Sequence, residues 1–180
     1  MKDVLRYLGI KGEADKKTID TVKEMRTLCQ SLTPSDRSAY FEIIKIKDGI
    51  KLKNTDVELC GNLVQKHFFN CKAVVLIIAT LSLKSEILLQ QVFAKSSQKA
   101  VVLDAVLTDE LEKYLDKIEM RLRDTYGEIT SRISCGYGDL NISKQKNIFD
   151  LLDGKSMGIV MKESFMMVPN KSVIAMVGVK

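Results

Sequence analysis

The chain has 180 residues, of which 46% are apolar and 28% are charged. This size and balance predict one compact globular domain and exclude a disordered or collagen-like protein. The longest apolar run, residues 73–81, is shorter than the roughly 20 residues that a membrane span requires. The opening residues lack the apolar stretch of a secretory signal. We therefore expect a cytoplasmic protein that does not bind membranes.

The charge pattern argues against a nucleic-acid-binding protein. The 28 basic and 23 acidic residues leave a net charge of +5, and the lysines are scattered along the chain. Nucleic-acid-binding domains concentrate basic residues on one face and interleave aromatic residues, whereas this sequence has no tryptophan. The excess of positive charge is compatible with an acidic partner protein.

Neither a metal site nor a catalytic triad is expected. The four cysteines form no Cys-x-x-Cys pair, and His67 is the single histidine. A structural zinc site requires closely spaced Cys and His ligands, so reduced thiols are predicted instead. With one histidine at the end of a predicted helix, no catalytic residue is assigned.

The first half of the chain predicts a mixture of helices and strands. Apolar residues recur at helical spacing over residues 15–32. Residues 40–46 and 50–53 flank an Asp48-Gly49 pair, which predicts a β-hairpin turning at those two residues. A helix is expected over residues 54–67. The continuous β-branched run at 73–81 predicts a strand buried on both faces.

The second half contains two further predicted helices, over residues 84–94 and 97–124, and then a loop rich in Gly, Ser and Thr. A helix over residues 143–151 and strands over 159–162 and 172–179 complete the prediction. Helices and strands do not alternate strictly, so we expect the α+β class.

One edge of the long predicted helix carries polar side chains. Asp104, Thr108 and Glu112 are spaced four residues apart, which stacks them on one side of the helix. Asp104 lies between apolar residues, and its position is consistent either with the boundary of the core or with a group that faces a ligand.

The loop between the long helix and residue 143 combines groups that could hold a small ligand. Arg132 offers a planar fork of donors that suits a carboxylate. Gly136 and Gly138 allow backbone N–H groups to approach a ligand closely, and Tyr137 between them supplies a ring and a hydroxyl group. The same composition also occurs in ordinary surface turns.

Two motifs in order carry a resemblance to a known family. The first is Arg132-x-x-x-Gly136-Tyr137, and the second is Glu-Ser-Phe-Met-Met-Val-Pro-Asn-Lys-Ser-Val over residues 163–173. Together they resemble the activation domain of cobalamin-dependent methionine synthase. The resemblance is strong over residues 103–177, looser over residues 1–100, and fits short stand-alone relatives. It implies a single domain over residues 1–180, with a bent antiparallel sheet flanked by helices.

The resemblance also implies a set of site residues. In that family the arginine loop binds S-adenosylmethionine, so Arg132 would pair with the carboxylate of the ligand and Glu112 would receive its amino group. Ser134 and Gly136 would hydrogen-bond the ligand, and Tyr137 would pack beside it. The second motif would line the site through Glu163, Ser164, Met167, Pro169 and Ser172.

The implied function is a reactivation module. In the family, inactive cobalamin is reduced by a flavodoxin-like donor and remethylated by S-adenosylmethionine on this domain. The chain lacks the Asp-x-His-x-x-Gly motif that ligates cobalt. Cobalamin would therefore arrive on a partner, either a corrinoid-binding protein or a methionine synthase without its activation domain.

The sequence departs from the family at two places. Cys135 occupies a position where relatives commonly have proline, and residues 174–177 lack the aromatic residue found downstream in the family enzyme. Two other functions remain open: a non-enzymatic docking subunit of a corrinoid methyltransferase, and a binder of a different amino-acid-like molecule.

Overall fold

The computed structural model describes residues 1–180, and its chain begins with two helices, α1 (Lys2–Tyr7) and α2 (Lys16–Cys29). Asp15 caps α2, because its side chain accepts a hydrogen bond of 2.6 Å from the Thr18 backbone N–H. The predicted helix over residues 15–32 is thus present, although it ends at Cys29.

The predicted hairpin forms, but its turn differs from the expected one. Strand β1 (Ser35–Ile46) pairs with β2 (Gly49–Leu52), and Lys47 and Asp48 make the two-residue connection. Gly49 already lies in the ladder opposite Ile46. A Cβ atom at Gly49 would stand 2.0 Å from the Leu59 carbonyl oxygen. Glycine is therefore required there by the neighbouring strand and not by the turn.

The helix predicted over residues 54–67 is wrong in its first half. Residues Glu58–Cys60 form strand β3, which pairs with β2, and only Asn62–His67 form a helix, α3. Leu59 is fully buried opposite Ile50. This pairing depends on β2, a contact between separate segments that local periodicity does not record.

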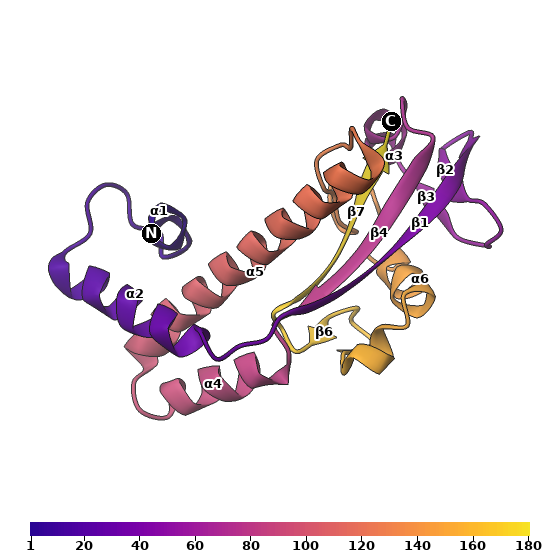
Figure 1. Cartoon of the computed structure of the whole chain (residues 1–180). Helices are drawn as coiled ribbons and strands as arrows, with labels where there is room; N and C mark the ends of the chain where they lie inside the picture. The colour runs from indigo at the N-terminus through magenta and orange to yellow at the C-terminus, as the bar shows by residue number, and fades with distance from the viewer.

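Five strands form an antiparallel sheet in the order β3-β2-β1-β4-β7 (Figure 1). Strand β4 (Ala73–Thr80) lies between β1 and β7 (Ser172–Val179), and all eight of its residues are buried. The prediction of a strand covered on both faces is confirmed, as is the α+β class with a curled antiparallel sheet flanked by helices.

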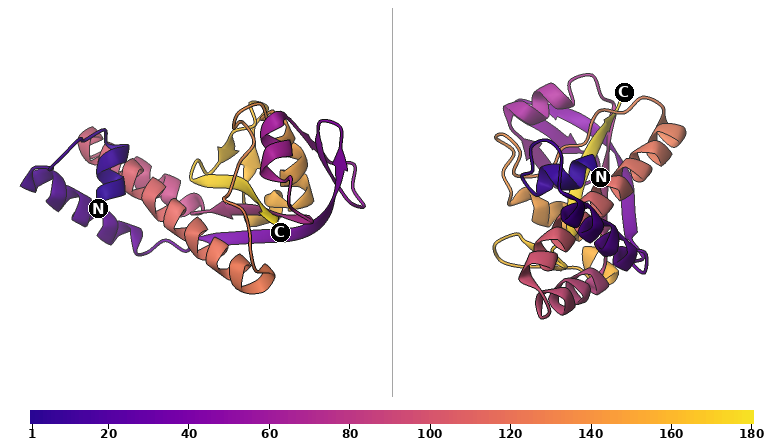
Figure 2. Two further views of the ribbon diagram at one scale, coloured as in Figure 1. Left: turned by 90° about the horizontal axis from the view of Figure 1, so that it is seen from above. Right: turned by 90° about the vertical axis from the view of Figure 1, so that its left-hand side faces the viewer.

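The two faces of the sheet are covered by different elements. Val75 and Ile77 of β4 pack in a core with α5 (Ser97–Tyr126), whereas Leu76 and Ile78 face a second core that includes α6 (Lys144–Leu151). Helices α1, α2 and α4 (Leu83–Phe93) gather around the N-terminal half of α5, beyond the sheet (Figures 1 and 2). The 3-10 helix η1 (Gly154–Met157) and a two-stranded sheet of β5 (Val160–Met161) and β6 (Met167–Val168) follow α6.

None of the helices combines the length and the apolar character needed to cross a bilayer.

Candidate functional site

Residues 128–139, here called the arginine loop, are fixed along the outer edge of β7. The Thr130 backbone N–H donates to Gly178 O at 2.9 Å, and Ile133 and Met176 exchange backbone hydrogen bonds of 3.0 and 2.8 Å. The Thr130 hydroxyl also accepts a hydrogen bond of 2.9 Å from the Gly178 N–H. The loop therefore continues the sheet for a few residues instead of lying free on the surface.

The pairing of the arginine loop with β7 ends at Met176, and the remaining edge of the strand stays open. Alternate residues of an antiparallel strand direct their backbone groups to the same side. The N–H and C=O groups of Ser172 and Ile174 therefore point away from β4, as those of Met176 do. No strand pairs with β7 at these two residues.

A cleft of about 440 Å³ lies at this open edge. Its lining includes Ser134 from the arginine loop together with Ser164, Met167 and Ser172 from residues 163–173, here called the second motif. Segments about 30 residues apart in the sequence thus meet at one cavity. Its volume lies in the range of cavities that hold small organic ligands.

Arg132 is not among the residues that line this cleft, and its side chain contacts α5. Its guanidinium donates to Glu112 Oε2 at 2.6 Å and to Asp116 Oδ1 at 2.9 Å, and it also binds the Glu119 carboxylate. Burial lowers the pKa of Arg132, but the three hydrogen-bonded carboxylates outweigh it and raise the pKa above its ordinary value. Arg132 is therefore permanently charged, and three of its five N–H donors are bound to carboxylates in this structure.

The structure brings Arg132 and Glu112 together and joins them directly to each other. Glu119 is the most buried of the three carboxylates, with 14% of its side chain exposed, and Arg123 contacts it from the other side at 3.3 Å. Glu112 and Asp116 are open to solvent, with 44% and 66% of their side chains exposed. These two carboxylates are the ones that an incoming ligand could replace.

The other acids on α5 have separate partners. Asp104 Oδ1 lies 2.8 Å from the Lys171 ammonium, to which the Thr108 hydroxyl is also bonded at 2.9 Å. Asp109 is 3% exposed and forms ion pairs of 2.7 Å with both Arg26 and Lys113. Asp109 therefore fastens α2 to α5, and neither Asp104 nor Asp109 contacts Arg132.

The remaining predicted site residues are more dispersed. Gly136 has φ +91° and donates its N–H to Leu140 O at 2.8 Å, while Tyr137 is 59% exposed outside the cleft. Glu163 lines a neighbouring cavity beside α6, and Pro169 is buried after a cis peptide bond. The cleft thus collects four of the ten predicted residues.

Sequence reasoning missed several residues of the cleft, of which Gln145 is the clearest. It is 8% exposed, and its side-chain amide donates to Phe165 O at 2.8 Å, which fixes the second motif against α6. Gln145 shares a helical face with Ile148, Phe149 and Leu152. A polar residue on that apolar stripe was the signal that could have identified it.

The histidine and the cysteines show no metal centre. His67 Nε2 lies 2.8 Å from Ser131 O and 2.9 Å from the Thr130 hydroxyl, so the ring supports the arginine loop. No group of three or more His, Cys, Asp or Glu side chains is arranged to hold a metal ion. Cys135 is buried, and burial raises the pKa of its thiol to about 11.

Comparison with known proteins bears on the fold. No family model and no curated protein matches this chain. Among solved structures, it is similar to a crystal structure of the MetH reactivation domain bound to AdoHcy, with a TM-score of 0.77. The match covers 97% of this chain and 72% of the other, at 14% sequence identity. The two chains share a fold.

Proposed function

We propose that this chain binds S-adenosylmethionine at the open edge of β7 and serves as a reactivation module for a corrinoid methyltransferase. The observation that carries the proposal is the cleft, because it brings Ser134, which lies within the arginine motif, together with Ser164, Met167 and Ser172 of the second motif. The similar solved structure is itself a reactivation domain with AdoHcy bound. The proposal extends its ligand chemistry to this chain.

The groups at the cleft suit an adenosyl ligand. Free backbone N–H and C=O groups of Ser172 and Ile174 can hydrogen-bond the edge of a base or a ribose. Met166, Met167 and Phe165 offer apolar and polarisable contact surface beside them. A few polar groups on a largely apolar lining are typical of small-molecule sites.

The amino-acid end of the ligand is assigned to Arg132 and Glu112. A zwitterion can replace their internal ion pair without leaving a charge unpaired, since Arg132 then binds the ligand carboxylate and Glu112 binds the ligand ammonium. Glu119 stays in place and keeps Arg132 oriented. The exchange requires the Glu112 side chain to turn, and its exposure to solvent permits this movement.

S-adenosylmethionine supplies an electrophilic methyl group when bound. The residues of this chain bind and orient the ligand, and proximity provides the rate advantage without a general acid or base. The acceptor is a corrinoid on a partner, either a corrinoid-binding protein or a methionine synthase that lacks its activation domain. A flavodoxin-like protein is the proposed electron donor.

The binding step is tested by calorimetric titration with S-adenosylmethionine and with AdoHcy. Ser134→Phe places a bulky ring in the cleft and should weaken binding at least about tenfold. Ser131→Phe is the matched control, because Ser131 is exposed on the same loop and does not line the cleft. Absence of binding by the unaltered protein, or equal losses in the two variants, would refute the assignment of the cleft.

The reactivation step is tested separately with a partner. A cobalamin-dependent methionine synthase lacking its activation domain, held in the cob(II) state with a reductant, is mixed with this chain and S-adenosylmethionine. Methylation of the corrinoid, followed by its visible spectrum, is expected only when all components are present. Ligand binding without any methylation would instead favour the docking or ligand-binding alternatives.

A further inference from the structure

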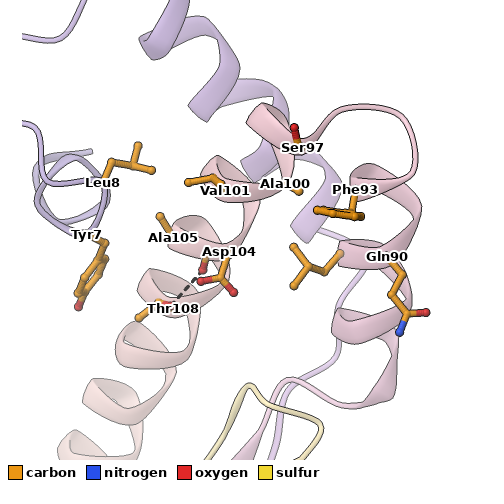
Figure 3. Close-up of a pocket in the computed structure, with 11 residues that line it drawn as sticks. Tyr7, Leu8, Gln90, Phe93, Ser97, Ala100, Val101, Asp104, Ala105 and Thr108 are labelled. Atoms are coloured by element: carbon orange, nitrogen blue, oxygen red, sulfur yellow. Dashed lines mark hydrogen bonds between the residues drawn. The ribbon is translucent and has the colours of Figure 1, made fainter.

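A second and larger cavity lies at the N-terminal half of α5 and shares no lining residue with the cleft. We call it the trough; its volume is about 730 Å³. The N-terminal half of α5 forms its floor, and α1 and α4 form its walls (Figure 3). Its position beside the N-terminal helices separates it from the proposed S-adenosylmethionine site.

The trough presents large apolar side chains that the fold leaves uncovered. Tyr7 on α1, Phe93 on α4 and Val101 on α5 are 39%, 64% and 63% exposed. Ala100 and Ala105 leave the cavity open, because their small side chains do not fill the space between α1 and α4. An apolar concavity of this size with aromatic walls is typical of a site for a small organic molecule.

One charged group lines the trough. Asp104 projects from the floor beside Thr108, and half of its side chain is exposed (Figure 3). Lys171 binds Asp104 Oδ1 at 2.8 Å but does not itself line the cavity. Oδ2 of Asp104 has no hydrogen-bond partner in the protein. A carboxylate oxygen is thus available to accept a hydrogen bond from a ligand.

We propose that the trough binds an organic cation with an aromatic or aliphatic body. The ammonium group of the ligand hydrogen-bonds Asp104 Oδ2, and its body covers the apolar floor and walls that Phe93, Val101 and Tyr7 provide. Charge selects among ligands of the same shape, because a neutral analogue gains the apolar contacts but lacks the charge-assisted hydrogen bond.

The test uses two probes of nearly equal shape, 4-phenylbutylamine and 4-phenylbutan-1-ol. Each probe is titrated into isotope-labelled protein, and binding is followed by the NMR chemical shifts of the backbone amides. The amine is expected to bind about tenfold more tightly than the alcohol. The shifts should map to residues of α1, α4 and α5 around the trough. Asp104→Asn should reduce the affinity for the amine to that for the alcohol and leave the alcohol unchanged.

Two control variants separate the trough from the ion pair between Asp104 and Lys171. Lys171→Met breaks the same ion pair but keeps the carboxylate, so it should strengthen amine binding. Val101→Trp fills the trough from an exposed position and should abolish binding of both probes.

The proposal is overturned if amine and alcohol bind equally, if Asp104→Asn changes nothing, or if neither probe binds up to about 10 mM. It is also overturned if sedimentation shows a dimer that Val101→Trp disrupts, because a second copy of the chain would then cover the trough.

Discussion

Arg132 and Glu112 are 20 residues apart in sequence and form an ion pair of 2.6 Å between the arginine loop and α5. We expect both side chains to meet a ligand, and in this structure they bind each other. Opposite charges that recognise a zwitterion are complementary to each other, so they pair when no ligand separates them. The ion pair is therefore compatible with a binding role, and it predicts that ligand and Glu112 compete for Arg132.

Glu112→Gln tests this competition. Loss of the charge that receives the ligand ammonium should weaken S-adenosylmethionine binding by about 1–3 kcal/mol in calorimetry. Asp116→Asn is the control, since Asp116 also contacts Arg132 and is more exposed. Asp116→Asn should leave the affinity for S-adenosylmethionine unchanged or improve it, because the Asp116 carboxylate no longer competes with the ligand for the Arg132 guanidinium. If Asp116→Asn causes the larger loss, Asp116 and not Glu112 is the amino-group ligand.

Arg132→Ala should weaken S-adenosylmethionine binding by about 1.5–3 kcal/mol, as expected for a lost charge-assisted contact. It should also lower the melting temperature, because it leaves the largely buried Glu119 with Arg123 as its remaining cation. Adding Glu119→Gln to Arg132→Ala should recover part of the stability without recovering the affinity. Normal binding by Arg132→Ala would show that Arg132 is structural only.

The purified chain is expected to contain no tightly bound corrinoid. The sequence lacks the motif that ligates cobalt, and the Nε2 atom of His67 is engaged with Thr130 and Ser131 of the arginine loop. The visible spectrum of the protein, purified from a host supplied with cobalamin, provides the measurement. A stoichiometric corrinoid spectrum would contradict the proposal that a partner brings the cofactor.

The sequence predicts best those elements whose signal is contained in one segment. The buried strand β4 and the long helix α5 match their patterns closely, since a β-branched run and a repeated apolar stripe are local features. Strand β3 was missed because Leu59 is placed by its pairing with Ile50 of another strand. Gly49 was misread for the same reason, as the group it must avoid belongs to β3.

The residues of the candidate site also divide into those that a local motif identifies and those that only folding brings together. The family resemblance implied Ser134 and Ser172 as site residues, and both line the cleft. It did not indicate that Arg132 would be bound by three carboxylates, because those acids come from successive turns of α5 and meet Arg132 only after folding. Lys171 was likewise overlooked, although it ties the second motif to Asp104.

The buried carboxylate of Asp109 predicts a specific dependence of stability on pH. Burial raises its pKa, but hydrogen bonds and charge from Lys113 and Arg26 outweigh burial and hold the pKa below its ordinary value. Because the folded-state pKa is depressed, the stabilisation is complete above the unfolded-state pKa of about 3.9 and is lost as pH falls through the folded-state value.

Asp109→Asn should therefore lower the free energy of unfolding by about 3 kcal/mol at neutral pH, since it leaves Arg26 and Lys113 without this buried partner. The difference in the free energy of unfolding between Asp109→Asn and the unaltered protein should stay constant down to about pH 5 and shrink below about pH 4. Urea unfolding of both proteins at a series of pH values measures this difference. Asp124→Asn, an exposed position on the same helix, is the control and should change stability by less than about 0.5 kcal/mol at every pH. A difference for Asp109→Asn that persists unchanged at the lowest pH would mean that packing, and not the charge of Asp109, holds α2 against α5.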